Sequence, residues 1–173
     1  MLDIFSRMVV GWTLVRRSNA AVAKQFIEQT IGEHQIEPGT LTIHADRRTE
    51  MSAQPVCKLF ERLAVTQSHS RPHVSDDNPY SGSQYKTMKY AADFSDRFGS
   101  FEYANKNTRA FMTHYNTEHR YSGIAMLIPA DVHSGSGPAK IALRHAAKLA
   151  AYEKFPDRFV QGKPKLDVLS DAV

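Results

Sequence analysis

The sequence predicts an α/β domain with a mixed sheet and flanking helices. Three observations support this fold class: two short β-branched and aromatic runs open the chain, apolar residues later recur at helical spacing, and a short alternating strand separates two such helical segments. Strands that alternate with helices are typical of α/β domains, and an opening hairpin adds antiparallel pairing. A chain of 173 residues can bury one such core without disulfides or structural metals.

The first half of the chain alternates predicted strands and helices. In order, the predicted elements are strands 2–5 and 8–15, a helix from Ala23, a strand at 40–45, a helix around 56–63 and a short strand at 65–68. Ser18 or Asn19 can cap the first helix, and Pro38-Gly39 follows its end. Pro55 is tolerated only in the first turn of the second helix, because its ring blocks helical hydrogen bonding further in.

The second half begins with a polar loop and is otherwise predicted to be helical. The segment SRPHVSDDNPYSGS, residues 70–83, is rich in Pro and Asx residues and is predicted to be a loop. Helical spacing resumes near Ser83 and again at Phe101. A Gly- and Ser-rich linker at Ser134–Pro138 precedes a last helix, rich in Ala and Lys, over about 139–155.

Composition and charge limit the classes of protein that fit. Hydrophobic residues make up 42% of the chain, yet no apolar run approaches the ~20 residues of a membrane span. The start MLDIFSRMVVGW lacks a basic leader and a cleavage site, and a single Cys57 fits a reducing compartment. We therefore expect a cytoplasmic protein with no membrane partner. A net charge of +4 favours a polyanionic partner only modestly, because many metabolic enzymes share it.

Five segments together resemble the integrase-like core of bacterial insertion-sequence transposases. They are, in order, LDIFSR with VVGW, IHADR, SRPHVSDDNPYSGSQYKTMKY, HYNTEHRYSGI and PADVH. Family members typically carry a DIFSR and VVGW hairpin, an H-S-D-R-G segment, an SRP loop leading to N-P-Y-S-E-x-x-F-K-T-x-K-Y, and W-Y-N-x-x-R-x-H-S-G-I. We expect residues 1–133 to form a partial integrase core, and residues 134–173 to form a basic helix and tail.

The resemblance implies a ribonuclease-H-like fold in which three carboxylates hold two divalent metals, Mg²⁺ or Mn²⁺. The metals serve phosphoryl transfer at DNA ends, one activating the nucleophile and the other stabilising the leaving oxygen. In the family the first carboxylate lies on a strand before the DIFSR segment, and we expect this chain to lack that first strand. Asp3 belongs by alignment to the second strand, so we expect it to be structural.

The second and third carboxylate positions map onto Asp46 and Gly82. Asp46 follows the predicted strand 40–45 and is expected to be the surviving catalytic and metal-binding carboxylate. Without the resemblance, a turn aspartate beside Arg47 would explain it better. The third position follows after 35 intervening residues, where Gly82 offers no side-chain oxygen. We therefore expect Mg²⁺ or Mn²⁺ to bind poorly and the chain to be catalytically incomplete.

Basic residues near the lost carboxylate are candidates for DNA binding. Lys86 and Lys89 match family positions expected to contact DNA phosphates, although a solvated helix face explains their spacing equally well. Arg71 in the SRP loop and the basic residues of the 139–154 helix are expected to contribute. Two further departures from the family pattern are Arg48-Thr49-Glu50 in place of Gly-Ser-Gln/Pro, and His114 in place of Trp. The second would cost several kcal/mol if that position is buried.

The resemblance leaves two function hypotheses open. The chain is a transposase-like protein whose DNA integration chemistry is incomplete, or it is a non-catalytic fragment that binds DNA or an intact transposase. The expected partners are insertion-sequence DNA ends, a full-length transposase, or a second copy of the chain, because unpaired strand edges favour self-association. An active nuclease would require Asp3, Asp46 and a loop aspartate to converge, which we consider the weakest hypothesis.

Overall fold

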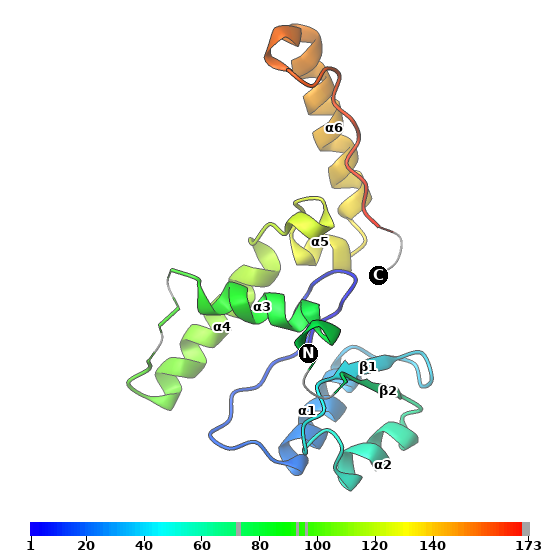
Figure 1. The fold of residues 1–173 in the computed structure, drawn as a ribbon, viewed down its shortest axis with the longest axis vertical. Helices are drawn as coiled ribbons and strands as arrows, with labels where there is room; N and C mark the ends of the chain where they lie inside the picture. Colours follow the sequence, from blue (N-terminus) through cyan, green and yellow to red (C-terminus); the bar gives the residue numbers. More distant parts are fainter. Residues whose placement is uncertain (72–73, 93, 96, 171–173) are drawn as a thin grey trace. The chain divides into compact units, whose positions relative to one another are not determined.

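A computed structural model describes residues 1–71, 74–92, 94–95 and 97–170, and shows two compact units. Unit 1 comprises Met1–Leu2 and Val10–Arg109, and unit 2 comprises Asp3–Val9 and Ala110–Val173. The helices are α1 (Ala20–Glu33), α2 (Gln54–Arg62), α3 (Pro79–Lys89), α4 (Phe101–Thr117), α5 (Pro129–His133) and α6 (Gly137–Lys154), and the strands are β1 (Thr42–Ala45) and β2 (Thr66–His69) (Figure 1).

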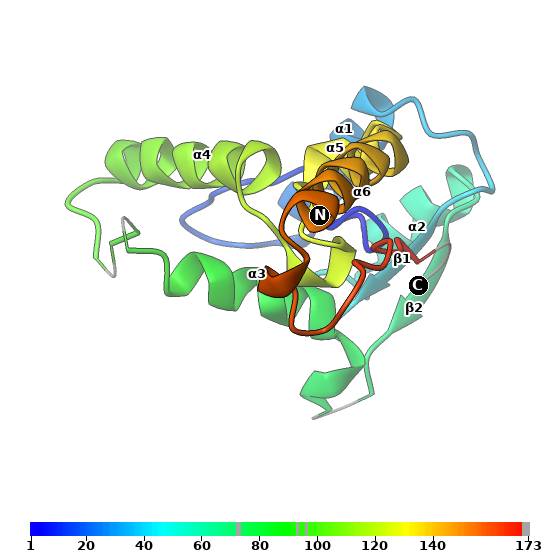
Figure 2. The same ribbon diagram turned by 90° about the horizontal axis from the view of Figure 1, so that it is seen from above.

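The sheet of unit 1 is a parallel pair. β1 and β2 lie side by side (Figure 2), with Thr42 opposite Thr66 and Ala45 opposite His69. The α/β class and the flanking helices are confirmed, and the strands at 40–45 and 65–68 are present. Over the described residues this pair is the whole sheet, so the antiparallel part of the expected mixed sheet is not seen there.

The core of unit 1 forms where α1 and α2 pack together beside β1. Its buried residues are Ile27, Ile31, Ile43, Val56, Leu59 and Phe60. α1 begins where predicted, because the Asn19 side chain caps it by accepting a hydrogen bond from the Val22 N–H at 2.9 Å. Pro55 lies in the first turn of α2, as expected, where its missing N–H leaves no helical bond unmade.

The predicted strands 2–5 and 8–15 are not formed over those lengths: bridge geometry remains only at Leu2 and Val9, and Val10 N–H donates to the Met1 carbonyl at 3.0 Å. The antiparallel reversal is present, but the predicted extent of the two strands was wrong. The chain reverses within Asp3–Val9, where Asp3 N–H donates to the Met8 carbonyl and Arg7 N–H to the Asp3 carbonyl. The Asp3 carboxylate also accepts the backbone N–H of Phe5, and Arg7 has a left-handed φ of 65°. Such local bonds compete with a strand ladder, so the segment forms a tight turn.

Unit 2 has its own small apolar core near the start of α6. Ile124, Leu127, Val132 and Ile141 are buried there, and Leu169 of the tail packs against them. The tail returns along α6 (Figure 1), held also by a Lys148–Asp167 ion pair of 2.8 Å. The C-terminal segment therefore consists of α6 and an extended tail that packs along it.

Two boundaries and one side chain differ from expectation. α3 begins at Pro79 rather than near Ser83, because proline is favoured in a helix's first turn. α6 begins at Gly137, inside the predicted linker. His114, which stands at the family's Trp position, is 58% exposed and lies 3.4 Å from Glu118, so the burial cost does not arise. No helix of the described chain is long and apolar enough to span a bilayer.

Candidate functional site

Asp46 lies at the edge of the sheet where both parallel strands end. It directly follows β1, and Ser70 directly follows β2, so the parallel register places the two residues side by side. The Ser70 hydroxyl donates to Asp46 Oδ1 at 3.1 Å. Ser70 is buried, with 6% of its surface exposed, whereas Asp46 is exposed to solvent. A buried hydroxyl therefore holds one oxygen of the exposed Asp46 carboxylate.

A hydrogen-bonded chain continues from Ser70 to His44 and Ser68. His44 Nε2 lies 3.2 Å from Ser70 Oγ, and His44 Nδ1 lies 2.8 Å from Ser68 Oγ. Ser70 has a single hydroxyl proton, which it gives to Asp46, so Ser70 Oγ accepts from His44 Nε2–H. In the neutral imidazole the Ser68 hydroxyl then donates to Nδ1. These hydrogen bonds orient the Ser70 hydroxyl, and the Ser70 hydroxyl in turn orients the Asp46 carboxylate.

Asn78 brings the start of α3 to the same carboxylate. It is the N-cap residue of α3, but its side chain does not cap the helix and instead donates from Nδ2 to Asp46 Oδ1 at 3.2 Å. Gly82 lies one turn further along the helix, and its N–H donates to the Asn78 carbonyl. Residues four apart share a helix face, so Gly82 follows Asn78 on the face that approaches Asp46.

Gly82 leaves room for a side chain at this point. A Cβ added to Gly82 would meet no atom within 4 Å, and the residue is exposed. Its backbone lies in the regular helix, so no conformational demand explains the glycine. The position can therefore accept a carboxylate on steric grounds, although none is present.

The donor set around Asp46 does not fit a pair of divalent metals. Mg²⁺ and Mn²⁺ prefer several oxygen ligands, with carboxylates among them. Here Asp46 supplies one carboxylate, while Asn78 turns its N–H toward it and Ser70 directs its proton to it. In the part of the chain that the structure describes, no three His, Cys, Asp or Glu side chains gather closely enough to hold a metal ion.

Arg71 and Asp77 form a bidentate ion pair within the loop before α3. Arg71 donates from Nε at 2.9 Å and Nη2 at 2.8 Å, and its backbone N–H also binds Asp77. These hydrogen bonds lower the pKa of Asp77 to about 2. Asp77 thus binds the start of the loop, and the Arg71 guanidinium already has a partner.

Lys86 and Lys89 lie on the exposed side of α3. Within the described residues neither lysine forms an ion pair, and the Lys89 ammonium lies 5.7 Å from the centre of the Tyr90 ring. They share their helix with Gly82, so one element carries both the candidate position Gly82 and two exposed lysines.

Two family models, each described as integrase core domain, match residues 1–75 and 63–129. Together the two integrase core models match residues 1–129 of this chain. A curated relative, the transposase for insertion sequence element IS904 of Lactococcus lactis subsp. lactis (strain IL1403), is 27% identical over 131 residues. The match covers 75% of this chain but only 51% of the relative, so the chain spans about half of that protein's length.

Solved structures confirm the integrase-core fold. One is the simian T-cell lymphotropic virus intasome in complex with PP2A regulatory subunit B56 gamma, with a TM-score of 0.61 and 14% identity over 76% of this chain and 46% of the other. Another is the catalytic core domain of BIV integrase, with a TM-score of 0.52 and 16% identity over 78% and 85%. At these identities the likeness shows the ribonuclease-H-like fold alone.

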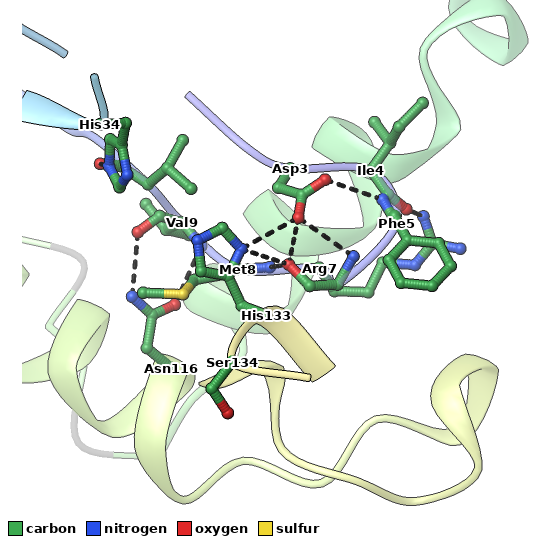
Figure 3. Close-up of polar contacts among 12 residues, drawn as sticks. Asp3, Ile4, Phe5, Arg7, Met8, Val9, His34, Asn116, His133 and Ser134 are labelled. Atoms are coloured by element: carbon green, nitrogen blue, oxygen red, sulfur yellow. Dashed lines mark hydrogen bonds and ion pairs between the residues drawn. The ribbon is translucent and has the colours of Figure 1, made fainter. Parts of the chain in front are cut away.

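Asp3 has a structural environment in unit 2. Its carboxylate accepts the Ser6 hydroxyl at 2.5 Å and faces His133 Nδ1 at 3.1 Å (Figure 3). Asn116 holds the same segment by exchanging two 2.9 Å hydrogen bonds with the backbone of Val9. Burial acts to raise the pKa of Asp3, but the hydrogen bonds from Ser6, His133 and the backbone lower it overall.

The lowered pKa of Asp3 predicts a pH-dependent contribution to stability. A carboxyl group whose pKa is depressed by folding stabilises the protein above its unfolded pKa of about 3.9, and that contribution is lost as the pH falls through the folded pKa. Asp3→Asn should therefore lower the free energy of unfolding by about 1–3 kcal/mol at pH 7. Urea denaturation should show this difference shrinking by pH 3, and an equal difference at both values would contradict the charged role.

Sequence patterns had indicated Asp46, Gly82, Lys86, Lys89 and Arg71, and the structure places all of them in unit 1. Sequence reasoning missed Ser70 and Asn78 as partners of the Asp46 carboxylate, and His44 as a partner of Ser70. One signal was available for Ser70, because it lies two residues after the predicted strand 65–68, much as Asp46 follows the predicted strand 40–45. The side-chain direction of Asn78 has no comparable signal, since an N-cap asparagine normally binds its own helix.

Proposed function

We propose that this chain is a transposase-like integrase core that binds DNA but does not complete the metal-dependent cutting and joining of DNA ends. The observation that carries the proposal is the surface of α3 beside Asp46. There Gly82 presents no carboxylate, while Lys86 and Lys89 on the same helix remain available for phosphates. The roles of Asp46 as remaining metal-site carboxylate, and of Mg²⁺ or Mn²⁺ as a weakly held cofactor, belong to this proposal.

Two comparisons support a DNA-related function. The curated relative is named as a transposase, and one fold neighbour is an intasome. Because the chain spans about half of the transposase, the cutting chemistry and the DNA ends of that protein are carried to this chain only as proposals.

α3 is a better candidate for DNA contact than α6 or the loop. On α6, Lys140 pairs with Asp131 at 2.6 Å, and Arg144 donates to the Ala125 and Met126 carbonyls at 3.0 Å. Arg71 is held by Asp77. These cations would have to give up existing partners to bind a phosphate. We therefore assign the main phosphate contacts to Lys86 and Lys89, and a secondary role to the basic segment 134–173.

DNA binding should be weak and strongly salt-dependent. Each neutralised duplex phosphate contributes about −0.9 to the slope of log affinity against log salt concentration, through counterion release. Replacing Lys86 and Lys89 together with glutamine should make the slope less steep by about 1.8. Fluorescence anisotropy on a labelled duplex at several salt concentrations measures this value.

A matched control distinguishes specific contacts from net charge. The double change Lys163→Gln and Lys165→Gln alters the net charge equally, but both residues lie in the exposed tail after α6. We expect this control to keep most of the native slope. Equal losses in the two double variants, or native binding that ignores salt, would contradict the assignment to α3.

A further inference from the structure

The exposed side of α3 and its C-cap carries aromatic as well as basic side chains. We call the following five exposed residues the α3 stripe: Gly82, Tyr85, Lys86, Lys89 and Tyr90. Their spacing of three, four, seven and eight residues from the first defines one helix face. Tyr85 is 63% exposed and Tyr90 is 77% exposed, whereas Gln84, on the opposite side, is buried. Two large rings therefore stand in solvent on one surface.

The order of side chains around the helix places the lysines between the tyrosines. At 3.6 residues per turn, Lys86 and Lys89 lie near the middle of the stripe, with Tyr85 at one margin and Tyr90 at the other. The two tyrosines are separated by about 7.5 Å along the helix axis, from a rise of about 1.5 Å per residue. The Lys89 ammonium already lies against the Tyr90 ring at 5.7 Å.

We propose that the α3 stripe binds single-stranded DNA, with phosphates on Lys86 and Lys89 and unpaired bases stacked on Tyr85 and Tyr90. The inference rests on the proposed DNA binding and adds the form of DNA that is bound. Proteins that hold single strands combine a basic surface with exposed aromatic rings, because every unpaired base offers a face for stacking.

A duplex uses this surface less fully than a single strand does. Its phosphates can reach the two lysines, but its bases are stacked on each other and cannot cover the rings. An unpaired strand can occupy both kinds of side chain at once. The α3 stripe contains no acidic residue. Its charge therefore favours a polyanion as binding partner over a protein surface that carries charges of both signs.

The test compares a labelled oligo(dT) single strand with a labelled hairpin duplex, using the full chain and fluorescence anisotropy at one salt concentration. The double variant Tyr85→Leu with Tyr90→Leu removes the rings and keeps apolar bulk. It should weaken single-strand binding by about tenfold or more, because stacking on a ring contributes strongly for each base. Duplex affinity should change by less than about twofold. The matched control, Tyr85→Phe with Tyr90→Phe, keeps the rings and should retain single-strand affinity.

Cross-linking provides a second measurement that does not depend on a variant. Oligonucleotides carrying 5-iododeoxyuridine should cross-link on irradiation to Tyr85 or Tyr90 of the native chain, as mapped by mass spectrometry. Cross-links confined to other residues would overturn the proposal, as would unchanged single-strand affinity in the leucine variant.

Three further outcomes separate this inference from the proposed function. If the native chain binds the duplex but the leucine variant binds single strands as well as the native chain does, only the single-strand proposal is overturned. Absence of native binding to either DNA overturns the proposed function as well. If sedimentation shows a native dimer that the leucine variant dissociates, the rings form a protein contact and the single-strand proposal fails.

Discussion

Leu59→Ala is expected to lower the free energy of unfolding by about 2–5 kcal/mol. Leu59 is 2% exposed and lies on α2 within the core cluster shared with α1 and β1. Alanine keeps the helix propensity of this position, so the loss reports core packing and not a weakened helix. The removed side chain leaves a cavity that the surrounding residues fill only in part.

Urea denaturation followed by circular dichroism measures this loss. The control is Leu143→Ala on α6, where the same atoms are removed from a side chain that is 72% exposed. We expect the control to change the free energy of unfolding by less than about 0.5 kcal/mol. Similar effects of the two substitutions would show that the α1, α2 and β1 cluster is not the stabilising core of unit 1.

Local sequence signals predicted the helices and the parallel strands of unit 1 well. Asn19 caps α1 because its side chain satisfies a free N–H, and that requirement is visible from composition and position alone. The helical recurrence of Val56, Leu59 and Phe60 marked the buried face of α2. In each case the decisive interaction lies within a few residues of the chain, which is why a pattern could identify it.

The beginning of the chain could not be predicted in the same way. A β-branched run forms a strand only where another strand pairs with it, and propensity does not supply that partner. Asp3 instead binds Ser6 nearby and His133, which is 130 residues away in sequence. Contacts of that range leave no periodic signal, so the antiparallel reversal at Asp3–Val9 was predicted to extend into two full strands.

In the candidate site, too, the sequence indicated positions along the chain but not the contacts between residues distant in sequence. The family pattern identified Asp46 and Gly82, but it did not show that Asn78 turns its amide toward Asp46 instead of capping α3. That orientation places the N-terminus of α3 beside Asp46, which follows β1. It also links the two positions physically, because Gly82 follows Asn78 by one turn on the same helix.

Gly82→Glu is expected to create a divalent-metal site that the native chain lacks. The new carboxylate would project from the helix face that approaches Asp46, into space where an added Cβ meets no atom within 4 Å. Two carboxylates can hold a hard cation together with water, so Mn²⁺ affinity should rise by about tenfold or more. Replacing a helical glycine should also stabilise the chain by up to about 1 kcal/mol.

Gly82→Gln separates the two effects of this substitution. Glutamine gives the same helix gain without the charge, so the glutamine chain should bind Mn²⁺ no better than the native chain. Adding Asp46→Asn to Gly82→Glu should abolish the gained affinity, measured by the electron paramagnetic resonance signal of free Mn²⁺. Equal Mn²⁺ binding by the glutamate and glutamine variants would show that position 82 does not face Asp46.

DNA cleavage is expected to remain absent in both the native chain and Gly82→Glu. The resemblance to transposases implies three carboxylates, and Gly82→Glu with Asp46 would supply only two of them, at the third and second positions. Metals held by too few ligands are poorly placed, and an error of about 1 Å can cost a hundredfold in rate. The assay incubates labelled DNA with each chain and Mn²⁺ and follows strand breaks on a denaturing gel. Breaks made by the native chain, and abolished by Asp46→Asn, would establish a working nuclease and refute the proposed loss of catalysis.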